Sequence, residues 1–131
     1  MIDTRWALRA GGGLNRFGLT TTARDLARLG LLILTRGMWR GERLVPNEFV
    51  DLAYHSSQPM NPSYGLLWWV NGQNSWDDWN NAGMRTGSFI PTAPGDLIAA
   101  RGIGDRKLYI VPSLGLVVTR LGGFAVRDAE D

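Results

Sequence analysis

Three short apolar runs near the C-terminal end form the clearest pattern in the sequence. They cover Leu97–Arg101, Lys107–Val111 and Leu116–Leu121, and turn residues separate them at 102–105 and 112–115. Runs of this length that are rich in Val, Ile and Tyr and bounded by Gly or Pro predict β-strands. In the second and third runs the apolar residues are consecutive rather than alternate, which indicates a sheet covered on both faces.

Two helices are predicted in the N-terminal half. Thr20–Arg36 has leucines at helical spacing, Thr22 and Asp25 form a capping pair at its start, and Gly37 follows as a stop signal. Leucines surround much of this helix, so we expect most of it to be buried. Pro46–Tyr54 begins with a proline and has an apolar side, which predicts a second, shorter helix.

The remaining segments are less regular. Met1–Leu19 contains three consecutive glycines and is expected to be loop-like; a phosphate-binding role for these glycines lacks the accompanying motif. Tyr64–Val70 predicts a strand that places Trp68 and Trp69 on opposite faces. Asn71–Gly95 is long and irregular but rich in aromatic residues, which indicates an ordered loop packed on the domain.

Composition limits the classes of function. The chain has 131 residues, with 44% hydrophobic and 20% charged residues, which suits one globular domain. It has no cysteine, so neither disulfides nor thiolate metal sites are expected. The net charge is +2 and the basic residues are interspersed, which argues against nucleic-acid binding. No apolar run approaches the ~18 residues of a membrane span, and the N-terminus lacks a signal-peptide core.

A search for catalytic motifs finds no complete site. No serine lies in a Gly-x-Ser-x-Gly elbow, and none is followed three residues later by lysine. His55, the only histidine, ends a predicted helix, where it complements the dipole. Asp77 and Asp78 could bind a cation weakly, although a pair of acidic residues in a loop is normally solvated.

The order of several scaffold motifs nevertheless resembles one family. The two most specific motifs are Thr22-Ala23-Arg24-Asp25-Leu26-Ala27-Arg28 and Tyr109-Ile110-Val111-Pro112-Ser113-Leu114, and the run YGLLWWV lies between them. From about Asp3 to Gly122 the chain resembles the C-terminal part of the serine β-lactamase-like superfamily. This superfamily contains class C-type β-lactamases, related esterases and D-alanyl-D-alanine peptidases.

The resemblance implies an α+β fold with an antiparallel sheet of three to four strands and two helices. It divides the chain into a helical part (1–57) and a part with strands and a long loop (58–131). It implies hydrolysis of a small-molecule ester or amide through an acyl-enzyme, without cofactor or metal. The family's Ser-x-x-Lys and Tyr-x-Asn motifs are absent, so the chain is expected to be an inactive fragment that lacks the N-terminal part of the same fold. Full-length relatives are often periplasmic or secreted.

The family's third motif, Lys-Thr-Gly, aligns with Ala100, Arg101 and Gly102, which are therefore the predicted substrate-binding residues. Gly102-Ile103-Gly104 is an alternative register, and neither register supplies the family's lysine. Glycine at position 102 would let substrate lie against the strand, but it is equally explained by the start of a tight turn.

Two other classes of function remain open. A non-catalytic binding or structural module could keep the same scaffold, and a carbohydrate-binding domain could use Trp76 and Trp79. Because only two helices are predicted to cover the sheet, we also expect one of its faces to lie exposed.

Overall fold

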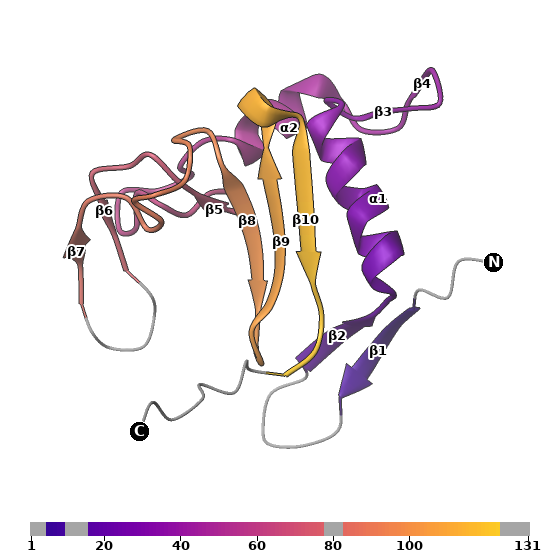
Figure 1. Cartoon of the computed structure of the whole chain (residues 1–131), viewed down its shortest axis with the longest axis horizontal. Coiled ribbons are helices and arrows are strands. Elements are labelled where there is room, and N and C mark those ends of the chain that lie inside the picture. Colours follow the sequence, from indigo (N-terminus) through magenta and orange to yellow (C-terminus); the bar gives the residue numbers. More distant parts are fainter. Residues whose placement is uncertain (1–4, 10–15, 78–82, 124–131) are drawn as a thin grey trace, which may run out of the picture.

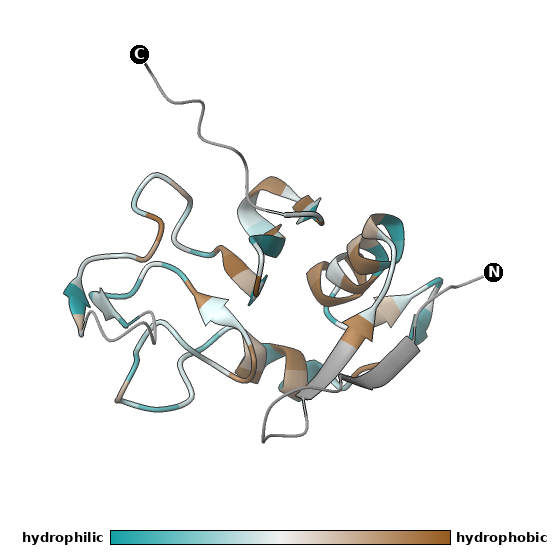
Figure 2. Ribbon diagram, turned by 90° about the horizontal axis from the view of Figure 1, so that it is seen from below, coloured by the Kyte–Doolittle hydropathy of each residue, from teal (hydrophilic) through white to brown (hydrophobic). Residues whose placement is uncertain are grey.

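The computed structural model describes residues 5–9, 16–77 and 83–123, and this part of the chain has an α+β fold. At its centre is an antiparallel sheet in the order β10-β9-β8-β5. Its strands are β5 (Trp69–Val70), β8 (Ile98–Gly102), β9 (Arg106–Val111) and β10 (Leu116–Arg120). Helix α1 (Ala23–Leu34) lies on one side of the sheet, and residues 71–77 and 83–97, here named the covering segment, lie on the other (Figure 1 and Figure 2). The predicted α+β class with antiparallel strands is confirmed.

The three C-terminal strands fall close to their predicted bounds. β8 and β9 are joined by a turn in which Gly104 and Asp105 have φ of 80° and 65°. β9 and β10 are joined by a short 3-10 helix, η1 (Pro112–Leu114), which Gly115 ends. The carboxylate of Asp96 accepts hydrogen bonds from the backbone N–H and the hydroxyl of Ser113, at 2.6 and 2.9 Å. These bonds tie the start of β8 to the turn after β9.

Helix α1 begins as the sequence predicts. Thr22 is its N-cap: its hydroxyl oxygen accepts a hydrogen bond from the backbone N–H of Asp25 at 3.1 Å. At the other end the chain turns into the left-handed region at Arg36 (φ 58°) and Gly37 (φ 81°). Their N–H groups donate back to carbonyl groups of the last turn, as in a Schellman motif. Helix α1 therefore ends with two residues in the left-handed conformation, an arginine as well as the predicted glycine.

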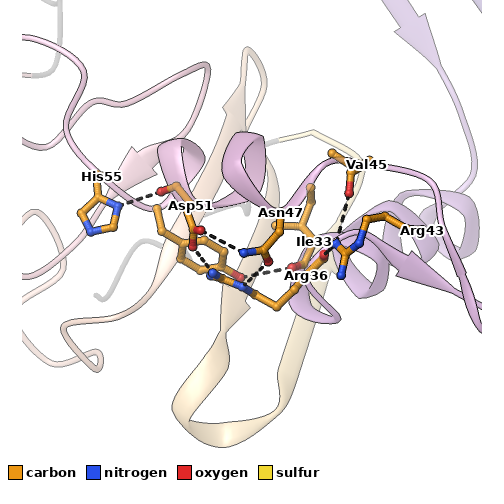
Figure 3. A network of polar contacts seen from close by, with 8 residues as sticks. Ile33, Arg36, Arg43, Val45, Asn47, Asp51 and His55 are labelled. Atoms are coloured by element: carbon orange, nitrogen blue, oxygen red, sulfur yellow. Dashed lines mark hydrogen bonds and ion pairs between the residues drawn. The ribbon is translucent and has the colours of Figure 1, made fainter.

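Helix α2 (Asn47–Ala53) is held to the end of α1 by polar contacts centred on Arg36 (Figure 3). The Arg36 guanidinium pairs with the carboxylate of Asp51, donates to Asn47 Oδ1 at 3.3 Å and lies over the ring of Tyr54. The carbonyl of Arg36 accepts a hydrogen bond from Arg43 at 2.9 Å. One residue in a left-handed conformation thus positions the second helix.

The packing of α1 on the sheet depends on Gly30. A Cβ atom at this position would lie 2.6 Å from Val117 Cγ1 and 2.8 Å from Leu108 Cδ1, so only glycine allows this close approach. Only one side of the helix reaches the sheet, because Leu29 and Leu31 remain 41% and 43% exposed. The expectation that most of α1 is buried is therefore wrong.

The second face of β8 and β9 is covered by loop rather than helix. Asn71 is 1% exposed, and its Nδ2 lies within hydrogen-bonding distance of the carbonyl oxygens of Ile90, Ala93 and Pro94, at 3.0, 3.3 and 3.0 Å. Its Oδ1 accepts from the backbone N–H of Ile90 at 3.0 Å. This holds Phe89 against Trp69 in a buried cluster. The expectation of an exposed sheet face is thus wrong for these two strands.

Strand β10 is less well covered than its neighbours. Leu116 and Val118 project to the same face as Tyr109 and are both 42% exposed. The covering segment packs on β5, β8 and β9, so among the strands of this sheet only β10 carries large apolar side chains that are exposed.

Two predictions for the other segments need correction. Met1–Leu19 is not loop-like throughout, because β1 (Arg5–Arg9) and β2 (Arg16–Thr20) form an antiparallel hairpin; the glycine run between them lies outside the described residues. Tyr64–Val70 is a strand only at Trp69–Val70, since the chain turns at residues 65–68. Trp68 and Trp69 do lie in separate core clusters, as predicted.

Two small hairpins complete the described elements. They are formed by β3 (Met38–Trp39) with β4 (Glu42–Arg43), and by β6 (Ser75–Trp76) with β7 (Arg85–Thr86). The second hairpin belongs to the covering segment. None of the described helices is long and apolar enough to cross a membrane.

We expect Asn71→Ala to lower the free energy of unfolding by about 2–4 kcal/mol, because it removes the buried carboxamide that binds the backbone of residues 90–94 and leaves the N–H of Ile90 without its partner. Chemical denaturation measures the loss. Asn74→Ala, in the exposed part of the same loop, is the matched control and should change stability by less than about 0.5 kcal/mol. Equal losses for the two variants would contradict the role of Asn71.

Candidate functional site

The predicted substrate-binding residues lie at the free end of β8, where the strand runs past β5. Ile98 and Ala99 pair with β5, whereas residues 100–102 have a described partner strand only in β9 (Figure 1). The Leu97 carbonyl accepts from Asn71 on the β5 side at 2.9 Å. Because backbone groups alternate between the two edges of an antiparallel strand, those of Ala99 and Arg101 point the same way. Arg101 therefore presents its N–H and C=O to an edge that no described strand occupies.

Ala100 and Gly102 take different positions. Their backbone groups point toward β9, where they pair with Leu108 and Arg106. The Ala100 side chain packs against the core cluster under α1, so it points away from the face that the covering segment covers. Gly102 is the last residue of β8, and a Cβ there would meet nothing closer than Arg106 Cβ at 3.5 Å.

The structure separates the two registers considered for the third motif. Gly102 is not among the residues with positive φ, so it ends the strand in a conformation that other residues also adopt. In the alternative register, Ile103 and Gly104 fall in the turn, where Gly104 has φ of 80°. Ala100-Arg101-Gly102 therefore lies in strand, and the alternative register does not.

The Arg101 side chain projects to the face covered by loop. Its guanidinium lies 5.2 Å from the centroid of the Trp69 ring and 5.8 Å from that of Phe89, within the range of cation–π attraction. Within the described residues no carboxylate pairs with it. The residue is exposed, so Arg101 lies beside the open edge with its guanidinium held over two aromatic rings.

Arg101 continues into a row of three cations across the sheet. Lys107 on β9 is directly opposite it, and Arg120 on β10 is directly opposite Lys107. Asp105 accepts from both, with Nζ of Lys107 at 2.6 Å and Nη1 of Arg120 at 2.8 Å. The hydrogen bond from Lys107, aided by the charge of Arg120, lowers the pKa of Asp105. Like charges placed opposite one another are unfavourable, and this one carboxylate reduces their repulsion.

Other polar residues do not assemble a catalytic centre in the described part of the chain. Four serine hydroxyls donate to nearby acceptors: Ser56 to Gln58 O, Ser63 to Ser75 O, Ser88 to Gln73 O, and Ser113 to Asp96. His55 Nδ1 lies 2.7 Å from the carbonyl oxygen of Asp51, at the end of α2. No group of three metal-ligating side chains occurs among these residues.

The other two candidates from the sequence have weak support. Asp77 has one buried carboxylate oxygen without a hydrogen-bond partner, but Asp78 lies outside the described residues. The Trp76 ring is covered by the guanidinium of Arg85 at 4.8 Å and meets Phe89 edge-on at 6.3 Å. It is therefore not a flat open platform for a sugar ring, and Trp79 also lies outside the described part.

The position of Asp105 predicts a pH dependence of stability. Its pKa is lower in the folded chain than its ordinary value of 3.8, so its stabilising contribution is complete above about pH 4. It is lost as the pH falls through the folded pKa. We expect the difference in unfolding free energy between the wild type and Asp105→Asn to be constant near neutral pH and to shrink in acid. Glu42→Gln, at an exposed carboxylate in β4, is the control, and a difference that grows in acid would contradict the ion-pair assignment.

Comparison with known proteins gives one informative match. No family model and no solved structure matches the chain. An uncharacterized protein from Alkalihalophilus pseudofirmus is 24% identical over 123 residues, which cover 90% of this chain and 34% of that protein. The chain thus spans about a third of the length of the curated relative that it matches.

Proposed function

We propose that this chain is the C-terminal part of a serine hydrolase similar to the β-lactamase-like superfamily, which cleaves esters or amides through an acyl-enzyme. The nucleophile and its base belong to a part of the protein that this chain does not contain. The open edge of β8 at Arg101 is the observation that carries the proposal. The greater length of the relative is consistent with a larger protein.

In this proposal the edge aligns the substrate. An extended amide-containing substrate adds to β8 as a further strand and pairs with the N–H and C=O of Arg101. The substrate carbonyl that accepts from the N–H of Arg101 is then the reacting acyl group, whose oxygen becomes negatively charged in the transition state; loss of such a donor costs ~10²–10³ in rate. Ala100 takes the position of the family's lysine, so proton transfer at this point must use another group.

A non-catalytic binding module is the second candidate. It is favoured by the absence of a complete catalytic centre in the described residues, since an open strand edge can bind a peptide without cleaving it. The DNA upstream of the Met1 codon distinguishes the two. An in-frame Ser-x-x-Lys sequence supports the hydrolase, and a translation start signal at Met1 supports the module.

We expect the isolated chain to hydrolyse neither a chromogenic cephalosporin nor p-nitrophenyl esters, because no described serine hydroxyl bonds to a lysine or histidine, and the one that bonds to a carboxylate, Ser113, lies in η1 away from the β8 edge. Initial rates should equal those of buffer at every substrate concentration. Saturable turnover that survives repurification, and that disappears when one of the six serines is replaced, would contradict the division of the site between two parts of a protein.

The second test uses the longer protein that carries Ser-x-x-Lys. Gly102→Val should lower kcat/KM by ~10²-fold, because a branched side chain crowds the end of the substrate edge. It should leave Tm nearly unchanged, because φ at this position is not positive and valine suits a strand. Gly123→Val, where a Cβ meets nothing within 4 Å, is the control. A fall in Tm with unchanged activity per folded molecule would reject the site assignment.

A further inference from the structure

The open edge of β8 exists because the chain before β5 turns away. Trp69 pairs with Ala99, so a longer β5 would have placed Trp68 opposite Ala100 and Leu67 opposite Arg101. Instead, a bridge between Tyr64 and Trp69 closes a tight turn with Leu66 and Leu67 at its tip. Leu67 is only two residues from Trp69, just as Arg101 is two residues from Ala99. Counted along the two strands, the tip therefore lies at the level at which the edge becomes free.

Neither packing nor backbone conformation explains leucine at the tip. Leu67 has φ of 66°, a left-handed conformation that glycine adopts easily and leucine does not. Its side chain is 82% exposed, and that of Leu66 is 36% exposed. Leu67 thus combines an unfavourable backbone conformation with a large apolar side chain that is exposed to water. Residues with a strained backbone conformation are often found at functional sites, where they contribute to ligand binding.

We propose that Leu66 and Leu67 form an apolar wall beside the Arg101 edge and make the site selective for substrates with an apolar group next to the edge-binding amide. This inference rests on the proposed function, because it assumes that the edge of β8 binds substrate. The amide of the ligand pairs with the backbone of Arg101, and its apolar side chain covers the exposed leucines. The preferred ligand is therefore an extended, peptide-like acyl compound with a hydrophobic side chain.

The test measures binding to the isolated chain, so it does not need the nucleophile. Two capped peptides serve as probes: acetyl-Leu-Leu-amide and acetyl-Ser-Gly-amide, which have equal numbers of backbone donors and acceptors. Shifts of the Arg101 amide signal in an NMR titration report binding at the edge. We expect both peptides to shift this signal and the leucine peptide to bind about tenfold more tightly, since its side chains are removed from water.

Two variants connect this preference to the wall. Leu67→Gly should abolish most of the tenfold preference while raising the denaturation midpoint, because glycine removes both the side chain and the strain. If Leu67 had only a structural role, its replacement by glycine would not lower the selectivity while raising the stability. Leu114→Ser, at a leucine that is 63% exposed in η1, is the control and should keep the preference.

The outcomes separate this inference from the proposed function. Equal binding of the two peptides at Arg101, or a preference that survives in Leu67→Gly, overturns the apolar wall and leaves the edge intact as a binding site. If neither peptide shifts the Arg101 signal, the edge itself is rejected, and the wall with it. A preference that is lost in Leu67→Gly and kept in Leu114→Ser supports the inference.

Discussion

The fold depends on covering both faces of β8 and β9, although the described part of the chain contains only two α-helices. Both faces of these strands are apolar, and α1 covers one face through its close approach at Gly30. The other face is covered by a segment that is irregular apart from the short hairpin of β6 and β7, and the backbone polar groups of such a segment must find partners. Asn71 supplies several of these partners with one carboxamide. A single buried side-chain amide thus allows a loop, rather than a helix, to cover this face of the sheet.

Strand β5 is limited at both ends, at one end by Asn71 and at the other by the turn that borders the candidate site. After Val70 the chain must place Asn71 beneath the loop at residues 90–94, and before Trp69 it has already turned at Leu67. Only two residues remain to pair with β8. The edge at Arg101 is therefore open because the chain turns away at Leu67, before it could pair with Arg101, whereas Asn71 ends β5 on the side of Leu97.

Much of the central fold was predictable from sequence because its signals are local. Strands β8–β10 are bounded by turn residues, and the Thr22 cap uses a hydrogen bond three residues away. The N-terminal hairpin was missed, since glycines that argue against a strand say nothing about the residues on either side of them. The shortening of Tyr64–Val70 was also missed, because no sequence rule places leucine at a position with φ of 66°. Both failures concern backbone geometry that the pattern of apolar residues does not determine.

The candidate site shows why a motif in sequence is less informative than its place in a sheet. Sequence alignment treats Ala100, Arg101 and Gly102 as one motif. In a strand, however, the backbone groups of adjacent residues face opposite edges and their side chains face opposite faces. Ala100 consequently belongs to the core, Gly102 pairs with β9, and Arg101 alone offers both a free backbone edge and an exposed cation. A site of this kind can orient a substrate through the backbone without supplying any proton-transfer group of its own. Under the proposed function, orientation of the substrate and cleavage of its bond are separate tasks, carried by residues far apart in the sequence.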